Sequence, residues 1–178
     1  MTMKDMLFGF EGRIRRRDWW LWSIATSLAY ALGLALVGLA FYSDAWDQVF
    51  VAPAVIGSPP AELAATIVLQ APMLWVQLAL AAKRAHDRAN SARVVIALNV
   101  ISVVASFLPP GRDIAQGFEQ VAPADIALWA LGAFNVVAGL YVLIVLGFLD
   151  GTPGPNRFGR SPKGIGGERA DVAADVFT

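Results

Sequence analysis

Residues 63–93 read LAATIVLQAPMLWVQLALAAKRAHDRANSAR, an apolar run that ends in a cluster of charges. The run from Leu63 to Ala82 is 20 residues without a charge, and Lys83 to Arg93 holds four cations, one acid and the chain's single histidine. A helix needs about 20 apolar residues to cross the hydrocarbon core of a bilayer. Each cation costs about 2.5–3.5 kcal/mol at the bilayer centre, so the charged stretch predicts a hinge in water between two membrane-spanning helices.

The rest of the chain repeats this pattern of apolar runs and charged connections. Its 178 residues are 57% apolar and only 16% charged, whereas a soluble domain carries about 25% charged residues. The mean hydropathy is +0.56. Further charge-free runs cover Trp19–Tyr42, Val94–Leu108 and Ile126–Leu149. We therefore predict an all-α integral membrane protein with four transmembrane helices over about 19–42, 63–82, 90–108 and 126–149. These form one domain, 1–162, followed by a flexible cytoplasmic tail, 163–178.

The distribution of Lys and Arg predicts the orientation of these helices. Thirteen of the 14 cations lie in the N-terminal segment, the 83–93 hinge and the C-terminal tail, which share one side if the chain crosses four times. Segments rich in Lys and Arg face the cytoplasm. We expect a multi-pass membrane protein with both termini cytoplasmic. Trp19, Trp20 and Trp22, at the start of the first run, are typical of residues at the membrane interface.

Composition also excludes several classes of site. The chain has no cysteine, so disulfides, thiolate zinc sites and cysteine nucleophiles are excluded. Its formal net charge is zero and no nucleic-acid recognition module surrounds the arginines, so we expect no nucleic-acid partner. A lone histidine, His86, does not make a metal site, and we predict no metal and no cofactor.

Three patterned segments lie on the predicted cytoplasmic side: FEGRIRRRDWW at 10–20, KRAHDRANSAR at 83–93 and DGTPGPNRFGRSP at 150–162. If the second helix continues through the hinge, Arg84 and Asp87 are one turn apart and can pair. Asp150 follows the last helix, where a carboxylate opposes the helix dipole, so we expect Arg13, Arg16 or Arg84 to compensate it.

The glycines of the third segment predict its backbone. Gly151 can terminate the last helix in the left-handed conformation, and Pro153-Gly154 suits the two central positions of a type II turn. Gly147 and Gly151 also have the spacing of a helix-contact motif.

In this order, the three segments resemble the DUF805 family of small bacterial inner-membrane proteins, and the resemblance covers residues 8–162. It matches Gly12, Arg13, Arg16 and Trp20 in the first segment, Arg84, His86, Asp87 and Ser91 in the second, and Gly151, Gly154, Asn156, Arg157, Gly159 and Pro162 in the third. The chain has Ala89 and Ala92 where the family usually has glycine, which suggests a stiffer hinge. The resemblance implies residence in a bacterial inner (plasma) membrane with this topology, but it implies no reaction.

The candidate site is a cytoplasmic interaction surface or structural latch formed by Arg13, Arg16, Arg84, His86, Asp87, Asp150, Asn156 and Arg157. The leading hypothesis is a non-enzymatic protein whose cytoplasmic face binds a protein partner or anionic lipid headgroups. A small transporter or channel is the first alternative, and its polar pathway would use Gln70, Gln77, Asn99 and Asn135. The second is a membrane-embedded enzyme acting at headgroup level, with His86 as base, Asp87 orienting it and arginines holding a phosphate. The sequence does not predict an oligomeric state.

Overall fold

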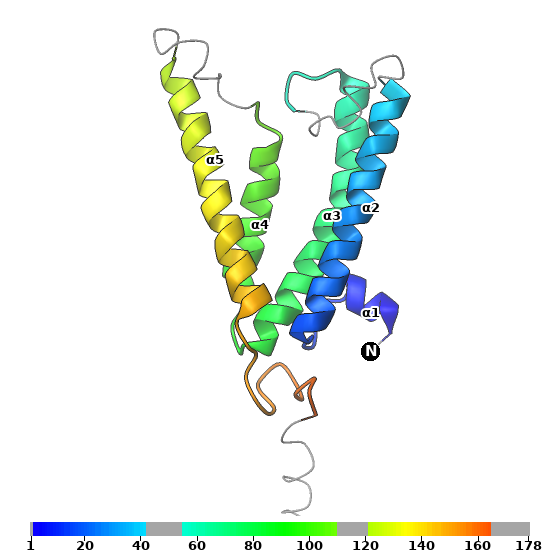
Figure 1. Ribbon diagram of the computed structural model, residues 1–178, viewed down its shortest axis with the longest axis vertical. Helices are drawn as coiled ribbons and strands as arrows, with labels where there is room; N and C mark the ends of the chain where they lie inside the picture. The colour runs from blue at the N-terminus through cyan, green and yellow to red at the C-terminus, as the bar shows by residue number, and fades with distance from the viewer. Residues whose placement is uncertain (1, 42–54, 110–120, 165–178) are drawn as a thin grey trace, which may run out of the picture. The chain divides into compact units, whose positions relative to one another are not determined.

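The computed structural model describes residues 2–41, 55–109 and 121–164, so residues 165–178 of the predicted tail lie outside it (Figure 1). The described chain is helical, with one isolated bridge between Asn156 and Gly159. Its elements are α1 (Met3–Phe8), α2 (Arg16–Phe41), α3 (Pro60–Asp87), α4 (Arg93–Ser106), α5 (Pro123–Val142) and the π-helical segment η4 (Leu143–Phe148).

The chain divides into two compact units, and each long helix runs from one into the other. Unit 1 contains the described parts of Met1–Thr26, Trp75–Ala97 and Val142–Thr178, and unit 2 contains those of Ser27–Leu74 and Leu98–Tyr141. All three patterned segments of the sequence belong to unit 1.

Within the described ranges, three helices are long and apolar enough to cross a membrane: Arg16–Ala40, Pro60–Asp87 and Pro123–Phe148, with 25, 28 and 26 residues. Their side chains remain largely exposed. On α2, Leu28, Leu32 and Leu36 share one face and are 66%, 62% and 59% exposed. Contiguous apolar surface of this kind is unfavourable in water and suits contact with lipid. The all-helical, apolar architecture predicted from the sequence is confirmed.

The predicted span over 90–108 is longer than the helix that the structure contains. α4 has 14 residues, about 21 Å at 1.5 Å per residue, whereas the hydrocarbon core is about 30 Å thick. A turn occupies the residues before Arg93, and Pro109 disfavours helical backbone at Leu108. Among the described residues, length therefore qualifies three helices for spanning, and α4 is a shorter apolar helix.

The core of unit 1 joins the N-terminal part of α2, the C-terminal part of α3 and η4. Trp19 is only 6% exposed, so its ring packs inside unit 1, whereas its predicted place at the membrane interface stays a prediction. Its ring meets Trp20 edge to face at 5.2 Å. A Cβ on Gly147 would lie 2.8 Å from the Trp20 ring and 3.1 Å from the Trp19 ring. Glycine at 147 therefore lets η4 pack directly against the tryptophans of α2.

α1 was not predicted, and a buried lysine of α3 holds it in place. Lys83 is fully buried, and its ammonium donates to the carbonyl oxygens of Asp5 and Met6, near the end of α1. The last carbonyls of a helix lack intrahelical partners, and a cation is favourable there. Trp75 of α3 adds a hydrogen bond of 3.2 Å to the Phe8 carbonyl. In Figure 1, α1 accordingly lies beside the lower part of α2 and α3.

The hinge after α3 turns on a residue in a left-handed conformation. The amide of Asn90 donates to the Ala85 carbonyl at 3.1 Å and that of Ala89 to the His86 carbonyl at 3.0 Å. These are the two bonds of a Schellman motif, whose turning residue is usually glycine. Here the position is Ala89, with φ 58°. The Cβ of an L-residue crowds the backbone in that region, so the hinge carries local strain.

Ala89→Gly is expected to stabilise the protein. Glycine removes the steric cost of the left-handed backbone, a gain of about 1 kcal/mol. Thermal unfolding of the detergent-solubilised protein measures this as a rise in melting temperature. Ala92→Gly is the matched control and should lower the melting temperature, because Ala92 has no positive φ and glycine there removes a buried methyl group and adds freedom to the unfolded chain. A lower melting temperature for Ala89→Gly would contradict the interpretation.

Candidate functional site

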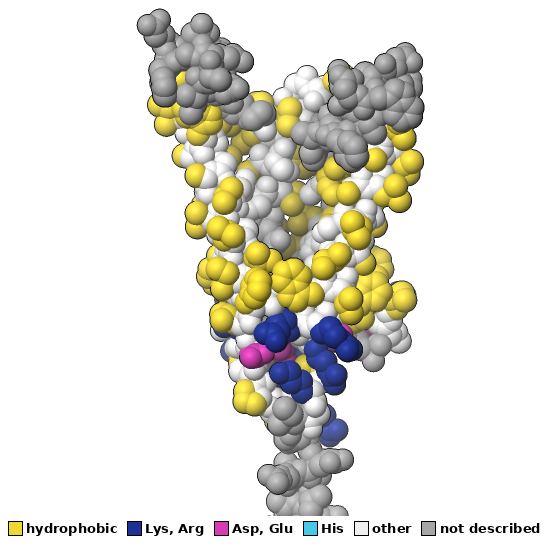
Figure 2. Space-filling model, in the orientation of Figure 1, with side chains coloured by type: hydrophobic (Ala, Val, Ile, Leu, Met, Phe, Trp, Pro, Cys, Tyr) yellow, Lys and Arg dark blue, Asp and Glu magenta, His cyan; other side chains and the backbone are white. Residues whose placement is uncertain are grey.

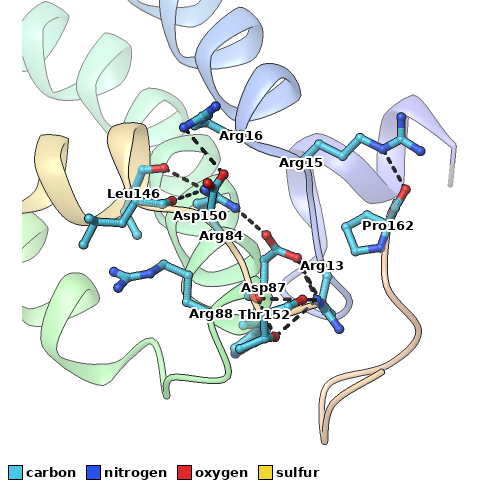
Figure 3. A network of polar contacts seen from close by, with 12 residues as sticks. Arg13, Arg15, Arg16, Arg84, Asp87, Arg88, Leu146, Asp150, Thr152 and Pro162 are labelled. Carbon is cyan, nitrogen blue, oxygen red and sulfur yellow. Dashed lines mark hydrogen bonds and ion pairs between the residues drawn. The ribbon is translucent and has the colours of Figure 1, made fainter. Parts of the chain in front are cut away.

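Asp87, the last residue of α3, holds two arginines with its two carboxylate oxygens (Figure 3). Oδ1 accepts from Arg13, with Nε at 3.1 Å and Nη2 at 3.0 Å. Oδ2 accepts a short hydrogen bond from Nη1 of Arg84. The side chains of Arg13 and Arg84 are 1% exposed and that of Asp87 is 5% exposed. The pairing of Arg84 with Asp87 predicted from helix spacing is confirmed. We refer to these three residues as the Asp87 latch.

Arg13 connects the first patterned segment to the third as well as to the hinge. Its Nη1 donates to the carbonyl oxygens of Gly154 at 2.8 Å and Gly159 at 3.2 Å, and its Nη2 donates to that of Thr152 at 2.8 Å. A guanidinium has five N–H donors in a fixed plane, which lets one side chain engage several segments. Arg13 therefore binds the C-terminal loop and the end of α3 at the same time.

Arg84 and its neighbours satisfy the carbonyls at the end of the last helix. The final carbonyls of a helix have no intrahelical partner and carry the negative end of its dipole. Five consecutive carbonyl oxygens, from Val145 to Leu149, accept from side chains of α2, α3 and the hinge. The donors are Arg88 to Val145, Arg84 to Leu146 and Leu149, Trp20 to Gly147, and Arg16 to Phe148, over 2.6–3.0 Å.

Gly151 lets the chain pass directly against Asp87. A Cβ at this position would lie 1.9 Å from the Asp87 carboxylate. The next residue, Thr152, then donates to the Asp87 carbonyl oxygen from its amide at 2.8 Å and from its hydroxyl at 2.9 Å. Gly151 has no positive φ, so the predicted left-handed helix end is wrong. Glycine is required at position 151 because the backbone there lies too close to Asp87 to leave room for a side chain.

The loop after Thr152 is a compact turn closed on itself and on the hinge. Gly154 has φ 78°, which agrees with the second central position of the predicted type II turn. Asn156 and Gly159 exchange backbone hydrogen bonds of 3.1 and 2.9 Å. The Asn156 amide group donates to the His86 carbonyl at 2.9 Å, and Arg157 donates to the Ala89 carbonyl at 3.3 Å. Asn156 and Arg157 thus attach the loop to the hinge.

The His86 ring lies apart from the Asp87 carboxylate contacts. It stacks on Phe158, with ring centroids 4.0 Å apart and an interplanar angle of 10°. The guanidinium of Arg157 lies over the Phe158 ring, 4.7 Å from its centroid. Both oxygens of Asp87 are held by arginines. The described contacts therefore place His86 in a packing arrangement with the C-terminal loop.

Arg16 and Asp150 lie on the exposed side of the same region. They pair at 3.6 Å, with side chains 48% and 71% exposed, so the prediction that a nearby cation compensates Asp150 is confirmed for Arg16. Beside them is a cavity of about 270 Å³ lined by Arg15, Arg16, Arg17, Arg84, Asp150, Gly151 and Lys163. Figure 2 shows the Lys and Arg side chains gathered at this end of unit 1, next to an apolar surface.

The structure thus brings together most of the predicted site residues, and it adds four that the sequence analysis did not assign. Arg13, Arg84 and Asp87 form the latch, Asn156, Arg157 and His86 form the loop contact, and Arg16 with Asp150 borders the cavity. The unassigned residues are Lys83, Arg88, Thr152 and Trp20. All four lie within or beside the patterned segments, but their partners are carbonyls, which no residue pattern reveals. Within the described residues, no group of three His, Cys, Asp or Glu side chains converges as a metal site would require.

Comparison with known proteins places the chain among relatives without an assigned activity. The family model described as "Protein of unknown function (DUF805)" matches residues 7–160. The proteins named Uncharacterized protein YiiR of Escherichia coli K12 and of Escherichia coli O157:H7 are each 29% identical over 167 residues, which cover 93% of this chain and 93% of each relative. No solved structure matches the chain.

Asp87→Asn is expected to destabilise the protein strongly, because it leaves two buried guanidinia without their carboxylate. Removing one partner of a buried ion pair costs about 3–5 kcal/mol. The melting temperature in detergent should fall, and trypsin should cut more rapidly at Arg157 and Arg160. Asp150→Asn is the control, since its exposed pair contributes about 0–1 kcal/mol. Equal behaviour of the two variants would show that Asp87 does not hold the loop.

Proposed function

The chain belongs to the DUF805 family, and from that premise we propose that it is an inner-membrane protein whose cytoplasmic face binds anionic lipid headgroups. The proposal places both termini and the hinge on the cytoplasmic side after four crossings. α4, although short, would complete the fourth crossing together with the residues that flank it. The observation that carries the proposal is the cavity of unit 1, where Arg and Lys side chains from separate segments converge, and where Arg16 also contacts Phe148, an exposed aromatic residue.

The described cations fall into two groups with different partners. Arg13 and Arg84 are buried and engaged by Asp87 and by carbonyl oxygens. Arg17, in contrast, is 79% exposed and has Asp18 at 3.6 Å as its ion-pair partner. The latch accounts for the buried cations as structural groups. It does not account for the exposed cations around the cavity, and these are available to anions.

The position of the cavity supports lipid as the source of those anions. Arg16 lines the cavity and also donates to the carbonyl of Phe148, whose ring is 60% exposed. Phe148 in turn meets Trp20 edge to face at 5.8 Å. Aromatic side chains next to cations are typical of headgroup depth, where acyl chains and phosphates meet. Cations near an anionic membrane surface attract it by about 1 kcal/mol each.

The contacts favour binding over the enzymatic alternative. That mechanism needs Asp87 to orient His86, but both carboxylate oxygens of Asp87 are engaged by Arg13 and Arg84. Of the amides considered for a transport pathway, Gln77 donates to the Thr26 hydroxyl at 3.0 Å, an interhelical contact. The competing hypothesis is that this face binds a protein partner, and the lipid experiment below distinguishes the two.

The proposed topology predicts the behaviour of reporter fusions. A phosphatase reporter that is active only outside the cytoplasm should be inactive after Lys163 and within 88–92, and active within 43–54 or 111–119. A fluorescent reporter that folds only in the cytoplasm should give the reverse pattern. An active phosphatase fusion in the hinge would refute the shared sidedness of the three segments. Western blots of each fusion control for expression.

Lipid binding should depend on headgroup charge and on salt. Protein purified in a neutral detergent should gain thermal stability from dioleoylphosphatidylglycerol and much less from dioleoylphosphatidylcholine. The difference in stabilisation between the two lipids should shrink as NaCl rises from about 50 to about 500 mM, because salt screens exposed charges. The same stabilisation by both lipids would remove the proposal and leave a protein partner as the better explanation of the basic face.

A further inference from the structure

The geometry points to a phosphate site in the cavity of unit 1, selective for a group with about two negative charges, such as a phosphomonoester or a diphosphate. This inference deepens the proposed function and rests on it for the source of the ligand, a lipid headgroup. The cavity of about 270 Å³ has seven lining residues, of which five are Arg or Lys and one is acidic. Arg84 is already paired with Asp87, so the other four cations and Asp150 leave a formal excess of three positive charges.

The cations reach the cavity from parts of the chain that are far apart in sequence. Arg15 directly precedes α2, and Arg16 and Arg17 begin it. Arg84 comes from the last turn of α3, and Lys163 follows the C-terminal loop. The contacts of the latch fix these segments to one another, since Arg13 binds both the end of α3 and the loop. The arrangement is thus held by buried interactions and does not require a ligand in order to form.

The contacts that position Arg15 and Arg16 use only some of their N–H donors. Arg15 donates through Nε to the Pro162 carbonyl at 2.6 Å, and Arg16 donates through Nη1 to the Phe148 carbonyl at 2.9 Å. Each guanidinium has five N–H donors, so most of them remain for another acceptor. Arg forks match the oxygen geometry of phosphate in a bidentate manner.

The size of the charge excess selects the ligand class. A phosphodiester carries one negative charge, whereas a phosphomonoester carries about −1.5 to −2 at neutral pH. Asp150 is the single acid in the lining and pairs with Arg16. An arriving phosphate competes with this carboxylate for Arg16 and is repelled by it. Asp150 therefore limits affinity, and its removal should strengthen binding, which is an effect that loss of structure does not produce.

The test measures binding of dioleoylphosphatidic acid, a monoester, and dioleoylphosphatidylglycerol, a diester, to the full chain in detergent by native mass spectrometry. Sodium pyrophosphate, titrated calorimetrically, is the soluble probe. The variant Arg17→Gln/Lys163→Gln removes two cations of the cavity and leaves the latch intact. Lys4→Gln/Arg160→Gln removes two cations of the same unit outside the cavity lining. Asp150→Asn removes the acid.

The wild-type chain should prefer phosphatidic acid over phosphatidylglycerol. Arg17→Gln/Lys163→Gln should weaken phosphatidic acid binding about tenfold or more, the effect of losing one or two charge-assisted contacts. Lys4→Gln/Arg160→Gln should change it less than about twofold, and Asp150→Asn should strengthen it severalfold. Unchanged binding in both the cavity variant and Asp150→Asn would overturn the site.

The outcomes separate this inference from the function on which it rests. If anionic lipids bind but the cavity variant binds like the wild type, the headgroup function stands and the cavity is not the site. If pyrophosphate binds with the expected dependence on Asp150 and lipids do not, the phosphate site stands with a soluble ligand, and the lipid function is refuted.

Discussion

The arrangement of unit 1 depends on one buried carboxylate. Asp87 ends α3 and accepts from Arg13 and Arg84, which are almost fully buried. Two guanidinia and one carboxylate leave an excess positive charge in a poorly solvated place, which would be unfavourable by itself. The excess is offset by carbonyl oxygens, because Arg13 also binds those of Thr152, Gly154 and Gly159. The hydrogen bonds of Arg13 to these carbonyls thereby join segments more than 130 residues apart in sequence.

The same principle explains why the last helix ends where it does. The five carbonyls from Val145 to Leu149 would be unsatisfied at a helix end, and each accepts from an Arg or Trp side chain. For a protein near a bilayer this matters more than in water, since solvent cannot replace every missing partner. Gly147 and Gly151 make the approach possible, one against the tryptophans of α2 and one against Asp87. Their spacing suggested a helix contact, but they face different partners.

Sequence reasoning succeeded where the physical signal is local. Runs of apolar residues predicted the long helices, and helical spacing predicted the pairing of Arg84 with Asp87. It failed where the partner is a backbone carbonyl or a distant segment. The sequence suggested only that Lys83 is one of the four hinge cations. In the structure it is buried against α1, a helix that was itself not predicted. The packing of Trp19 in the core was not predicted either, because it depends on the close approach that Gly147 allows between η4 and α2.

Counting cations along the sequence treats all arginines of the basic face alike, but their capacity to bind an anion differs. The charges of Arg13 and Arg84 already interact with Asp87 and carbonyl oxygens at short range, so an external anion would have to displace those contacts. The side chain of Arg17 is 79% exposed and lines the cavity, where an anion can bind it while displacing few existing contacts. The attraction of this face for a membrane therefore depends on which few cations the latch leaves unengaged, and the net charge of the segment is a poor guide to it.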